Sequence, residues 1–537
     1  MTSLHRIAAL ATIATTALAT SPPRPGTPMP DTFRQFVQQG KLALSTRGLV
    51  PWTNRTRANR AAVRAGTMSP TAAAAAGGTI IEGTRQIPVL AVKFKNTGSD
   101  PFPIANLQKE LFDGPWSPGT MTDFYKEISY GRLTVNGTVF PWKQISQNDT
   151  FYEAGCNGLC GTSKVPNLLK EALDLNDGAI DFAQYDNDGK DGIPNSGDDD
   201  GFVDFVAFVH PEAGGECGNS NIWSHRSAIS DWTGSDYTTN DAKHGGGFIK
   251  INDYVIQPAF ACDGSTMIQI GVFSHEFGHA FGLPDLYDTD SNNGTSAGLG
   301  AWCLMASGSW GGDNQSPERP THMSAWAKEF LGWIDPTEVG ADIKPATIGN
   351  MEDNPVAFKI AISPTQYYLI SNRQKAKFDQ NLPIAGLMVQ KINQTVIDAT
   401  MSTNKVNADE TNPGVALVQA DGNSDLENNN GRGDSGDLFP GSKNRKVFDS
   451  TTSPKMLVGS ICNVAVSGAD VTADLVTSAA TCATGGGGGG KPGCSGILPI
   501  PGNGSGDGTG PGAALLIAPA LVALVLLALR KFTSVTA

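Results

Sequence analysis

One short segment constrains this chain more than any other: HEFGHAFGLPD, which runs from His275 to Asp285. His275 and His279 are four residues apart, so on an α-helix both imidazoles lie on one face, with Glu276 beside them. Gly282 predicts the end of that helix, because glycine readily takes a positive φ, and the resulting turn returns Asp285 as a third ligand. The segment therefore predicts a helix and a tight turn around one metal ion.

Three protein ligands are typical of catalytic zinc, because they leave one coordination position open, whereas structural zinc sites use four. We expect the metal to lower the pKa of a bound water and to polarise a carbonyl group. Glu276 then serves as general base and afterwards returns the proton as general acid. The alternative for so short a pattern is a surface helix with two histidines, but the glycine and aspartate in register favour the catalytic interpretation.

A second segment, WCLMASGSW at Trp302–Trp310, follows the histidines along the chain. It resembles the methionine turn that underlies the zinc site in metzincin-type peptidases, in which the methionine packs and does not bind metal. Met305 alone would more often be an ordinary core residue. Its distance downstream of His279 favours the structural role beneath the metal.

Both ends of the chain carry sorting features. Residues 1–19 combine a basic start, a short apolar stretch and an Ala-x-Ala site, which predict a secretory signal peptide cleaved after Ala19. Residues 513–529 are apolar and are followed by a basic tail at 530–537, which predicts a membrane-spanning sorting helix. A glycine-rich linker precedes it at 485–512. We expect an exported protein that is held at the cell envelope or surface, or secreted after C-terminal processing.

Between these ends we predict a pro-segment and two domains. Residues 20–82 are rich in Pro, Ala and Arg without a clear period, residues 83–342 mix apolar strands with helices, and residues 343–484 are dominated by short β-type runs. The expected fold class is α+β, a metzincin-like zinc peptidase catalytic domain followed by a β-rich domain. Predicted strands are Gln86–Phe94, Leu133–Phe140, Phe202–His210, Gln366–Ser371 and Gly386–Val389, and predicted helices are Met121–Ser129 and Val165–Leu175.

The net charge limits the kinds of partner that the chain can bind, and the cysteines relate to the compartment in which it folds. A formal net charge of -13 argues against nucleic acid or an anionic membrane surface as partner. Eight cysteines in an exported chain are expected to be mostly paired. Cys303 would remain as a buried thiol, and Cys494 would belong to the sorting segment. The pairs that the spacing suggests are Cys156–Cys160, Cys217–Cys262 and Cys462–Cys482.

Together these segments resemble the immune inhibitor A type of secreted metallopeptidase, the M6 family. The resemblance implies zinc held by His275, His279 and Asp285. It also implies Glu276 as catalytic base and peptide bonds of proteins or peptides as substrate. The chain departs from the family at Val389–Asn393, where relatives tend to carry a Trp-His-Ile-Asp-like run. The matching segments are Val89–Phe94, Asp123–Gly131, His275–Asp288, Pro320–Trp326, Asn372–Lys375 and Gly433–Gly441.

Two acidic stretches resemble the single Asp-rich loop of that family, split here by an insertion at 190–199. Carboxylate oxygens suit calcium, so we expect a structural calcium ion there. The spacing is not that of an EF-hand, because no glutamate stands at the twelfth position. The alternative is a solvated acidic turn, since Asp and Gly are common in turns. The expected calcium ligands are Asp186, Asp188, Asp200 and Asp204.

Two rival functions stay open on sequence: a zinc hydrolase of another amide, and a catalytically inactive surface adhesin. Substrate assays separate the first, and the intact Glu276 argues against the second. Residues Arg432–Asp434 have the Arg-Gly-Asp sequence of integrin-binding tripeptides, but this sequence often occurs by chance in glycine-rich loops. His322 could donate to an oxyanion, although a lone histidine is more often a hydrogen-bonded core group. No spacing ties His210 or His225 to the metal.

Overall fold

The computed structural model describes residues 19–31, 48–290, 293–478 and 481–482, and these described residues fall within one compact unit. Most of the predicted signal peptide, the glycine-rich linker and the predicted membrane helix lie outside the described residues. Within the described part, no helix is long and apolar enough to cross a membrane.

A six-stranded sheet forms the centre of the first half of the chain, in the order β1-β5-β8-β4-β2-β3. β2 lies parallel to β3 and β4, and β4 lies parallel to β8, whereas β5 and β1 are antiparallel additions at one edge. The mixed strand directions agree with the predicted combination of helices and strands. The strands are β1 (Ala19–Thr20), β2 (Gly83–Lys93), β3 (Leu133–Gln144), β4 (Val206–Ala213), β5 (His225–Ala228) and β8 (Asp253–Phe260).

Alternate residues of β2 enter two different cores, because successive side chains of a strand point to opposite faces. Val89 and Ala91 belong to the core that contains the helices α5 (Met121–Ile128) and α9 (Ile270–Ala280). Leu90 and Val92 belong to the core on the other face, which contains α7 (Val165–Asp174). The sheet is therefore covered on both faces, and the histidine segment lies on one of them.

α5 and α7 follow the predicted helices closely. At the start of α5, Thr120 and Asp123 form a capping box, in which each side chain bonds the main-chain N–H of the other. The predicted strands also form, with shifted ends: the strand predicted at Phe202–His210 begins at Val206 and continues to Ala213. The residues before Val206 pair elsewhere, because the N–H of Val203 donates to the carbonyl oxygen of Lys250 and that of Asp204 to the carbonyl oxygen of Tyr185.

The later half forms two further sheets with a core between them. Alternate residues again separate the faces: Tyr368 and Ile370 of β12 pack against the smaller sheet, while Leu369 joins the core that holds α9. The apolar core thus runs across the predicted domain boundary at 342. The larger sheet has the order β14-β13-β12-β11-β9, and the smaller has β10-β16-β15. The strands are β9 (Thr337–Glu338), β10 (Ile343–Ile348), β11 (Phe358–Ser363), β12 (Gln366–Arg373), β13 (Gly386–Asn393), β14 (Val415–Leu417), β15 (Ser460–Ser467) and β16 (Asp470–Val476).

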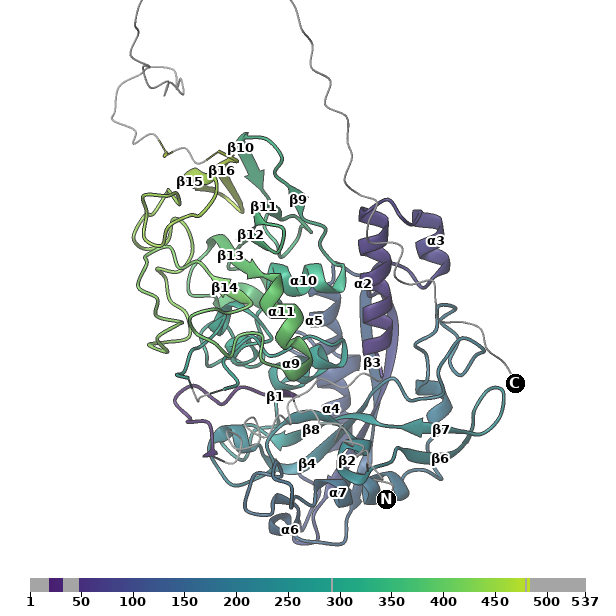
Figure 1. The fold of residues 1–537 in the computed structure, drawn as a ribbon. Helices are drawn as coiled ribbons and strands as arrows, with labels where there is room; N and C mark the ends of the chain where they lie inside the picture. Colours follow the sequence, from purple (N-terminus) through teal and green to yellow (C-terminus); the bar gives the residue numbers. More distant parts are fainter. Residues whose placement is uncertain (1–18, 32–47, 291–292, 479–480, 483–537) are drawn as a thin grey trace, which may run out of the picture. The chain divides into compact units, whose positions relative to one another are not determined.

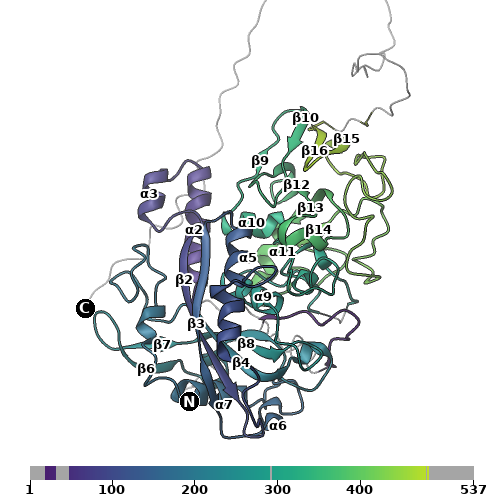
Figure 2. The ribbon, with the colours of Figure 1, turned by 180° about the vertical axis from the view of Figure 1, so that it is seen from behind.

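The predicted pro-segment contains order that its sequence did not indicate. Helix α2 (Val50–Arg64) and the shorter α3 (Pro70–Ala75) form within it, and Figures 1 and 2 show α2 beside the long strands β2 and β3. The missing apolar period has a physical reason, because the buried face of α2 includes the polar residues Thr53, Thr56 and Asn59. These residues satisfy their polar groups by hydrogen bonds to main-chain carbonyls.

The smaller elements connect these layers. The three disulfides suggested by the spacing are all formed, and Cys303 is a free, buried thiol, as expected. Within the described residues, the other α-helices and strands are α4 (Ile104–Gln108), α6 (Asp149–Glu153), α8 (Ile229–Thr233), α10 (Ala325–Leu331), α11 (Gln394–Thr400), β6 (Tyr237–Ala242) and β7 (Phe248–Ile251).

Candidate metal centre

Helix α9 carries the histidine motif through the interior. Every residue of α9 is buried, and two glycines let its backbone approach its neighbours. A side chain at Gly271 would meet the main chain of Ser309, and one at Gly278 would overlap the sulfur of Met305. Gly282 takes the expected positive φ of 81° and turns the chain after the helix.

The three predicted ligands converge. The Nε2 atoms of His275 and His279 are 3.1 Å apart, and Oδ1 of Asp285 is 3.1 Å from the first and 3.2 Å from the second. All three side chains are fully buried. The turn at Gly282 thus places the carboxylate beside both imidazoles, in the arrangement that the spacing predicted.

Hydrogen bonds on the far side of each ring orient the imidazoles. Nδ1 of His275 donates to the carbonyl oxygen of Leu304, and Nδ1 of His279 donates to that of Leu283, each at 2.8 Å. With the hydrogens on Nδ1, the lone pairs of both Nε2 atoms face each other and the Asp285 carboxylate. Outer partners of this kind fix the tautomer of metal-binding histidines.

Three electron-rich atoms held this close repel one another unless a cation lies between them. Burial lowers the pKa of His279, which favours the neutral ring that binds metal. Imidazole and carboxylate are common zinc ligands, so His275, His279 and Asp285 fit such an ion.

Glu276 lies beside this cluster with no hydrogen-bond partner on either carboxylate oxygen, and it is fully buried. Burial raises the pKa of Glu276 well above its ordinary value, and the charges of Asp285 and Glu216 raise it further. A carboxyl group that binds a proton readily and has both oxygens free is suited to accept and return a proton.

Met305, the methionine of the predicted turn, lies against α9. It is fully buried, its carbonyl oxygen accepts a 2.7 Å bond from the N–H of Leu286, and its side chain lies against Gly278. The preceding residue, Leu304, supplies the carbonyl oxygen that orients His275. The turn therefore connects the histidine helix to the segment after Asp285.

Three contributors to the site were missed by sequence reasoning. Nδ2 of Asn404 donates to Oδ2 of Asp285 at 2.6 Å, and its Oδ1 accepts from the main-chain N–H of Asp285 at 2.7 Å. The hydroxyl of Tyr287 donates to the carbonyl oxygen of Thr20 at 2.8 Å, and that oxygen is 3.1 Å from Nε2 of His275. The proximity of Tyr287 to Asp285 in sequence was a usable signal, but Thr20 and Asn404 are distant in sequence and carry none.

The acidic loop contains a second cluster. Carboxylate oxygens of Asp186, Asp188 and Asp204 lie within 4.8 Å of one another, and all three residues are buried. One oxygen of Asp186 and one of Asp188 have no partner. Burial raises the pKa of Asp186 to about 8, with neighbouring carboxylates adding to the shift. Asp200 is not part of this cluster; burial, and then the charge of Asp188, raise its pKa to about 6.

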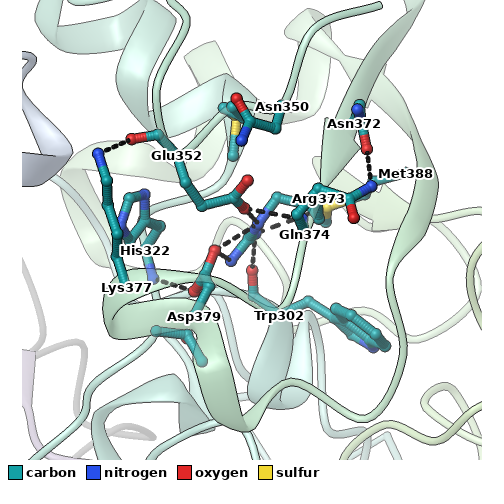
Figure 3. A network of polar contacts seen from close by, with 12 residues as sticks. Trp302, His322, Asn350, Glu352, Asn372, Arg373, Gln374, Lys377, Asp379 and Met388 are labelled. Atoms are coloured by element: carbon teal, nitrogen blue, oxygen red, sulfur yellow. Dashed lines mark hydrogen bonds and ion pairs between the residues drawn. The ribbon is translucent and has the colours of Figure 1, made fainter. Parts of the chain in front are cut away.

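His322 belongs to a buried polar network (Figure 3). Its Nε2 bonds Oε1 of Glu127 at 2.7 Å, and its Nδ1 faces Nζ of Lys328 at 3.2 Å. The structure thus favours the core role over the oxyanion role. Both ring nitrogens of His210 lack partners, whereas His225 bonds the carbonyl oxygen of Trp223 and the hydroxyl of Tyr254.

Comparison with known proteins identifies relatives of the region around the metal centre. Residues 111–334 match the family model of the immune inhibitor A peptidase M6 catalytic domain. The chain is 33% identical over 224 residues to the pre-pro-metalloprotease PrtV of Vibrio cholerae serotype O1, which is 40% of this chain and 23% of that protein. It is 32% identical over 232 residues to immune inhibitor A of Bacillus thuringiensis subsp. alesti, which is 40% of this chain and 31% of that protein. The chain therefore spans less than a third of these relatives.

Proposed function

Residues 111–334 belong to the immune inhibitor A peptidase M6 family, and on this premise we propose that the chain is an exported, zinc-dependent endopeptidase. The observation that carries the proposal is the convergence of His275, His279 and Asp285 beside the unpartnered carboxyl group of Glu276. A buried cluster of two imidazoles and one carboxylate suits a cation, and the adjacent free carboxyl group suits proton transfer. The fold around it would be metzincin-like, with Met305 beneath the metal.

His275, His279 and Asp285 would hold the zinc ion, which when bound lowers the pKa of water and polarises a carbonyl group. Glu276 would take the proton from the attacking water at one of its free oxygens. It would then return this proton to the nitrogen of the leaving amine. Asn404 would keep Asp285 in place through its two hydrogen bonds.

Tyr287 would orient the substrate. Its hydroxyl donates to a peptide carbonyl oxygen that faces His275, namely that of Thr20. A substrate carbonyl in the same place would receive the same hydrogen bond, which becomes stronger as negative charge develops on the oxygen. The edge of β5, on which β1 lies antiparallel, offers main-chain hydrogen bonds to an extended peptide. Substrates would therefore be proteins or peptides that bind as a strand.

A calcium ion would stabilise the acidic loop through Asp186, Asp188 and Asp204, with Asp200 at the margin. The unpartnered oxygens of Asp186 and Asp188 support this assignment. The predicted signal peptide would direct export and would be cleaved after Ala19. The predicted helix at 513–529 would hold the protein at the cell envelope, either transiently or after maturation.

Casein hydrolysis by the protein after its own processing tests the proposal, together with metal analysis and chelation. We expect zinc-dependent cleavage, and we expect Glu276→Ala to keep its zinc while losing hydrolysis by several orders of magnitude. A matched control is Glu318→Ala, which changes a carboxylate outside the metal centre. Equal hydrolysis by Glu276→Ala would remove Glu276 from the mechanism. Bound zinc without cleavage of any peptide would favour a hydrolase of another amide.

A further inference from the structure

Arg432 lies in a loop of the β-rich region that is anchored beside the metal centre. The N–H of Ala301 donates to the carbonyl oxygen of Arg432 at 2.6 Å. The indole N–H of Trp302 donates to Oδ2 of Asp437 at 2.8 Å. These bonds hold the main chain on both sides of the Arg432 side chain against the segment that leads into the Met305 turn.

The side chain of Arg432 lines a cavity of about 250 Å³. Tyr287 lies on the wall of this cavity, and its hydroxyl group donates to the carbonyl oxygen that faces His275. Pro22 and Pro23, which follow the strand paired with β5, lie on the opposite wall. The cavity therefore adjoins the edge of the sheet at which an extended substrate would bind.

The guanidinium group of Arg432 has no carboxylate partner among the described residues. Its Nη1 donates to the carbonyl oxygen of Pro23 at 2.8 Å. Asp288 lines the same cavity, but its two oxygens accept the main-chain N–H groups of Asp290 and Ser296 at 2.8 and 3.1 Å. Burial lowers the pKa of Arg432 to about 10, as expected for a cation that is partly removed from water without an acid beside it. The side chain therefore stays charged at neutral pH, and its charge is not balanced locally.

The contact with Pro23 shows where Arg432 meets an extended peptide. The carbonyl oxygen of Thr20 is 3.1 Å from Nε2 of His275, and the carbonyl group that Arg432 binds belongs to the third residue after Thr20. A substrate that pairs with β5 in the same place would present its own third residue to Arg432. A guanidinium group binds a carboxylate more strongly than a neutral carbonyl, because charge attraction adds to the hydrogen bond and two parallel bonds can form.

We propose that Arg432 is a positioning and specificity residue of the peptidase, and that it selects substrates with a carboxylate three residues beyond the carbonyl group that faces the metal. Either the free carboxyl end of a peptide or the side chain of Asp or Glu supplies this carboxylate. The inference rests on the proposed peptidase function. It gives the β-rich region a direct part in substrate binding.

Three peptides with one common sequence test the proposal. Each has three residues beyond the cleaved bond: the first ends in an amide, the second in a free carboxylate, and the third in an amide with Glu as the last residue. We measure kcat/KM for the protein after its own processing, as wild type, Arg432→Gln and Arg432→Lys, and identify the cleaved bond by mass spectrometry. We expect wild type to prefer the free carboxylate or the Glu peptide over the neutral amide on the order of tenfold or more.

The substitution removes the preference and not the reaction. Arg432→Gln should cleave all three peptides at similar rates, whereas Arg432→Lys, which keeps the charge without the planar fork, should keep part of the preference. The comparison of the second and third peptides shows whether the chain end or an acidic side chain is the better source of the carboxylate. Arg445→Gln, at an exposed arginine of the same region, is the matched control and should keep the full preference.

The preference is a ratio between substrates, so a loss of folded protein does not change it, and zinc content and melting temperature are measured beside it. Equal ratios for wild type and Arg432→Gln would overturn the proposal, as would a wild type that does not distinguish either charged peptide from the neutral one. Casein hydrolysis separates this failure from failure of the proposed function. If casein is cleaved but Arg432→Gln keeps the wild-type ratios, the peptidase proposal stands and the role of Arg432 does not. Cleavage of neither casein nor any of the peptides would contradict both.

Discussion

At the scale of single residues, helix α9 can pack closely against Met305 only because Gly278 has no side chain. A Cβ there would overlap the sulfur of Met305, which is itself fully buried. We expect Gly278→Ala to lower the free energy of unfolding by about 1–3 kcal/mol, the usual cost of overpacking a core. The same substitution should weaken metal binding, because the proposed ligand His279 is the next residue in the chain. Chemical denaturation and zinc titration measure both effects.

The matched double variant tests the cause. Gly278→Ala combined with Met305→Ala removes the overlapping sulfur, so it should be less destabilised than the sum of the two single variants. Strict additivity of the two changes would show that Met305 is not what limits position 278.

His210 gives a residue-scale prediction for pH. Burial lowers the pKa of His210 from 6.5 to about 3, and neither ring nitrogen has a partner. Below pH 6.5 the unfolded chain therefore binds a proton at His210, whereas the folded chain does not bind it until the pH approaches about 3. The contribution of this group to stability is complete above pH 6.5 and is lost as the pH falls toward about 3.

We expect His210→Phe, which keeps a ring against Phe94, to flatten the acid side of the stability curve. Between pH 6.5 and pH 5 wild type should lose about 2 kcal/mol more than the variant. Urea unfolding at several pH values measures the difference. His244→Gln, at an exposed histidine, is the control, and equal slopes for His210→Phe and wild type would contradict the assignment.

At the scale of elements, sequence patterns predicted the features that interactions between residues near in sequence determine. The spacing of His275, His279 and Asp285 was sufficient because one helix and one glycine turn position all three. Helix α2 was not predictable, because tertiary contacts and not an apolar period stabilise it: Arg60 donates to the carbonyl oxygens of Thr79, Glu329 and Phe330. Asn404 was missed for a related reason, since its link to Asp285 spans 119 residues and has no sequence period.

In the acidic loop before β4, the ionisation of the buried carboxyl groups affects the stability of the fold. Burial and neighbouring carboxylates raise the pKa of Asp186 to about 8, and burial raises that of Asp204 to about 7. Both values exceed the ordinary 3.8, so without a cation the folded chain retains protons that the unfolded chain releases. The stability that these protons provide is complete below pH 3.8 and is lost as the pH rises toward 8.

Calcium should remove this loss, because it neutralises the carboxylates in the folded state. With zinc held constant, we expect added calcium to raise the melting temperature more at pH 8 than at pH 5. Asp186→Asn should abolish the rise, whereas Asp263→Asn, in an exposed loop, should keep it. Scanning calorimetry measures the shift. An equal response of Asp186→Asn and wild type would reduce the loop to an ordinary acidic turn.

At the scale of the whole molecule, a buried ionic network joins the two predicted domains (Figure 3). Arg373 of β12 donates to Asp379 at 2.6 and 2.8 Å and to the carbonyl oxygen of Trp302 at 2.8 Å, beside the Met305 turn. Burial and the charge of Asp379 raise the pKa of Glu352 to about 8. Burial opposes ionisation of Asp379, but Arg373 lowers the pKa of its carboxyl, so Arg373 and Asp379 form a buried ion pair.

Arg373→Met should therefore destabilise the whole unit, because it leaves the buried charge of Asp379 without the arginine that pairs with it, and the N–H of His322 is the donor that still bonds this carboxylate. Removing one member of a buried pair costs about 3–5 kcal/mol, whereas an exposed pair contributes about 0–1 kcal/mol. Lys359→Met, which removes the more exposed pair with Glu338, is the matched control. Since the core that holds α9 also contains Leu369 of β12, tryptophan fluorescence and zinc release should report one shared unfolding transition at lower urea. Two separate transitions, with zinc release unchanged in Arg373→Met, would mean that the metal centre and the β-rich region fold independently.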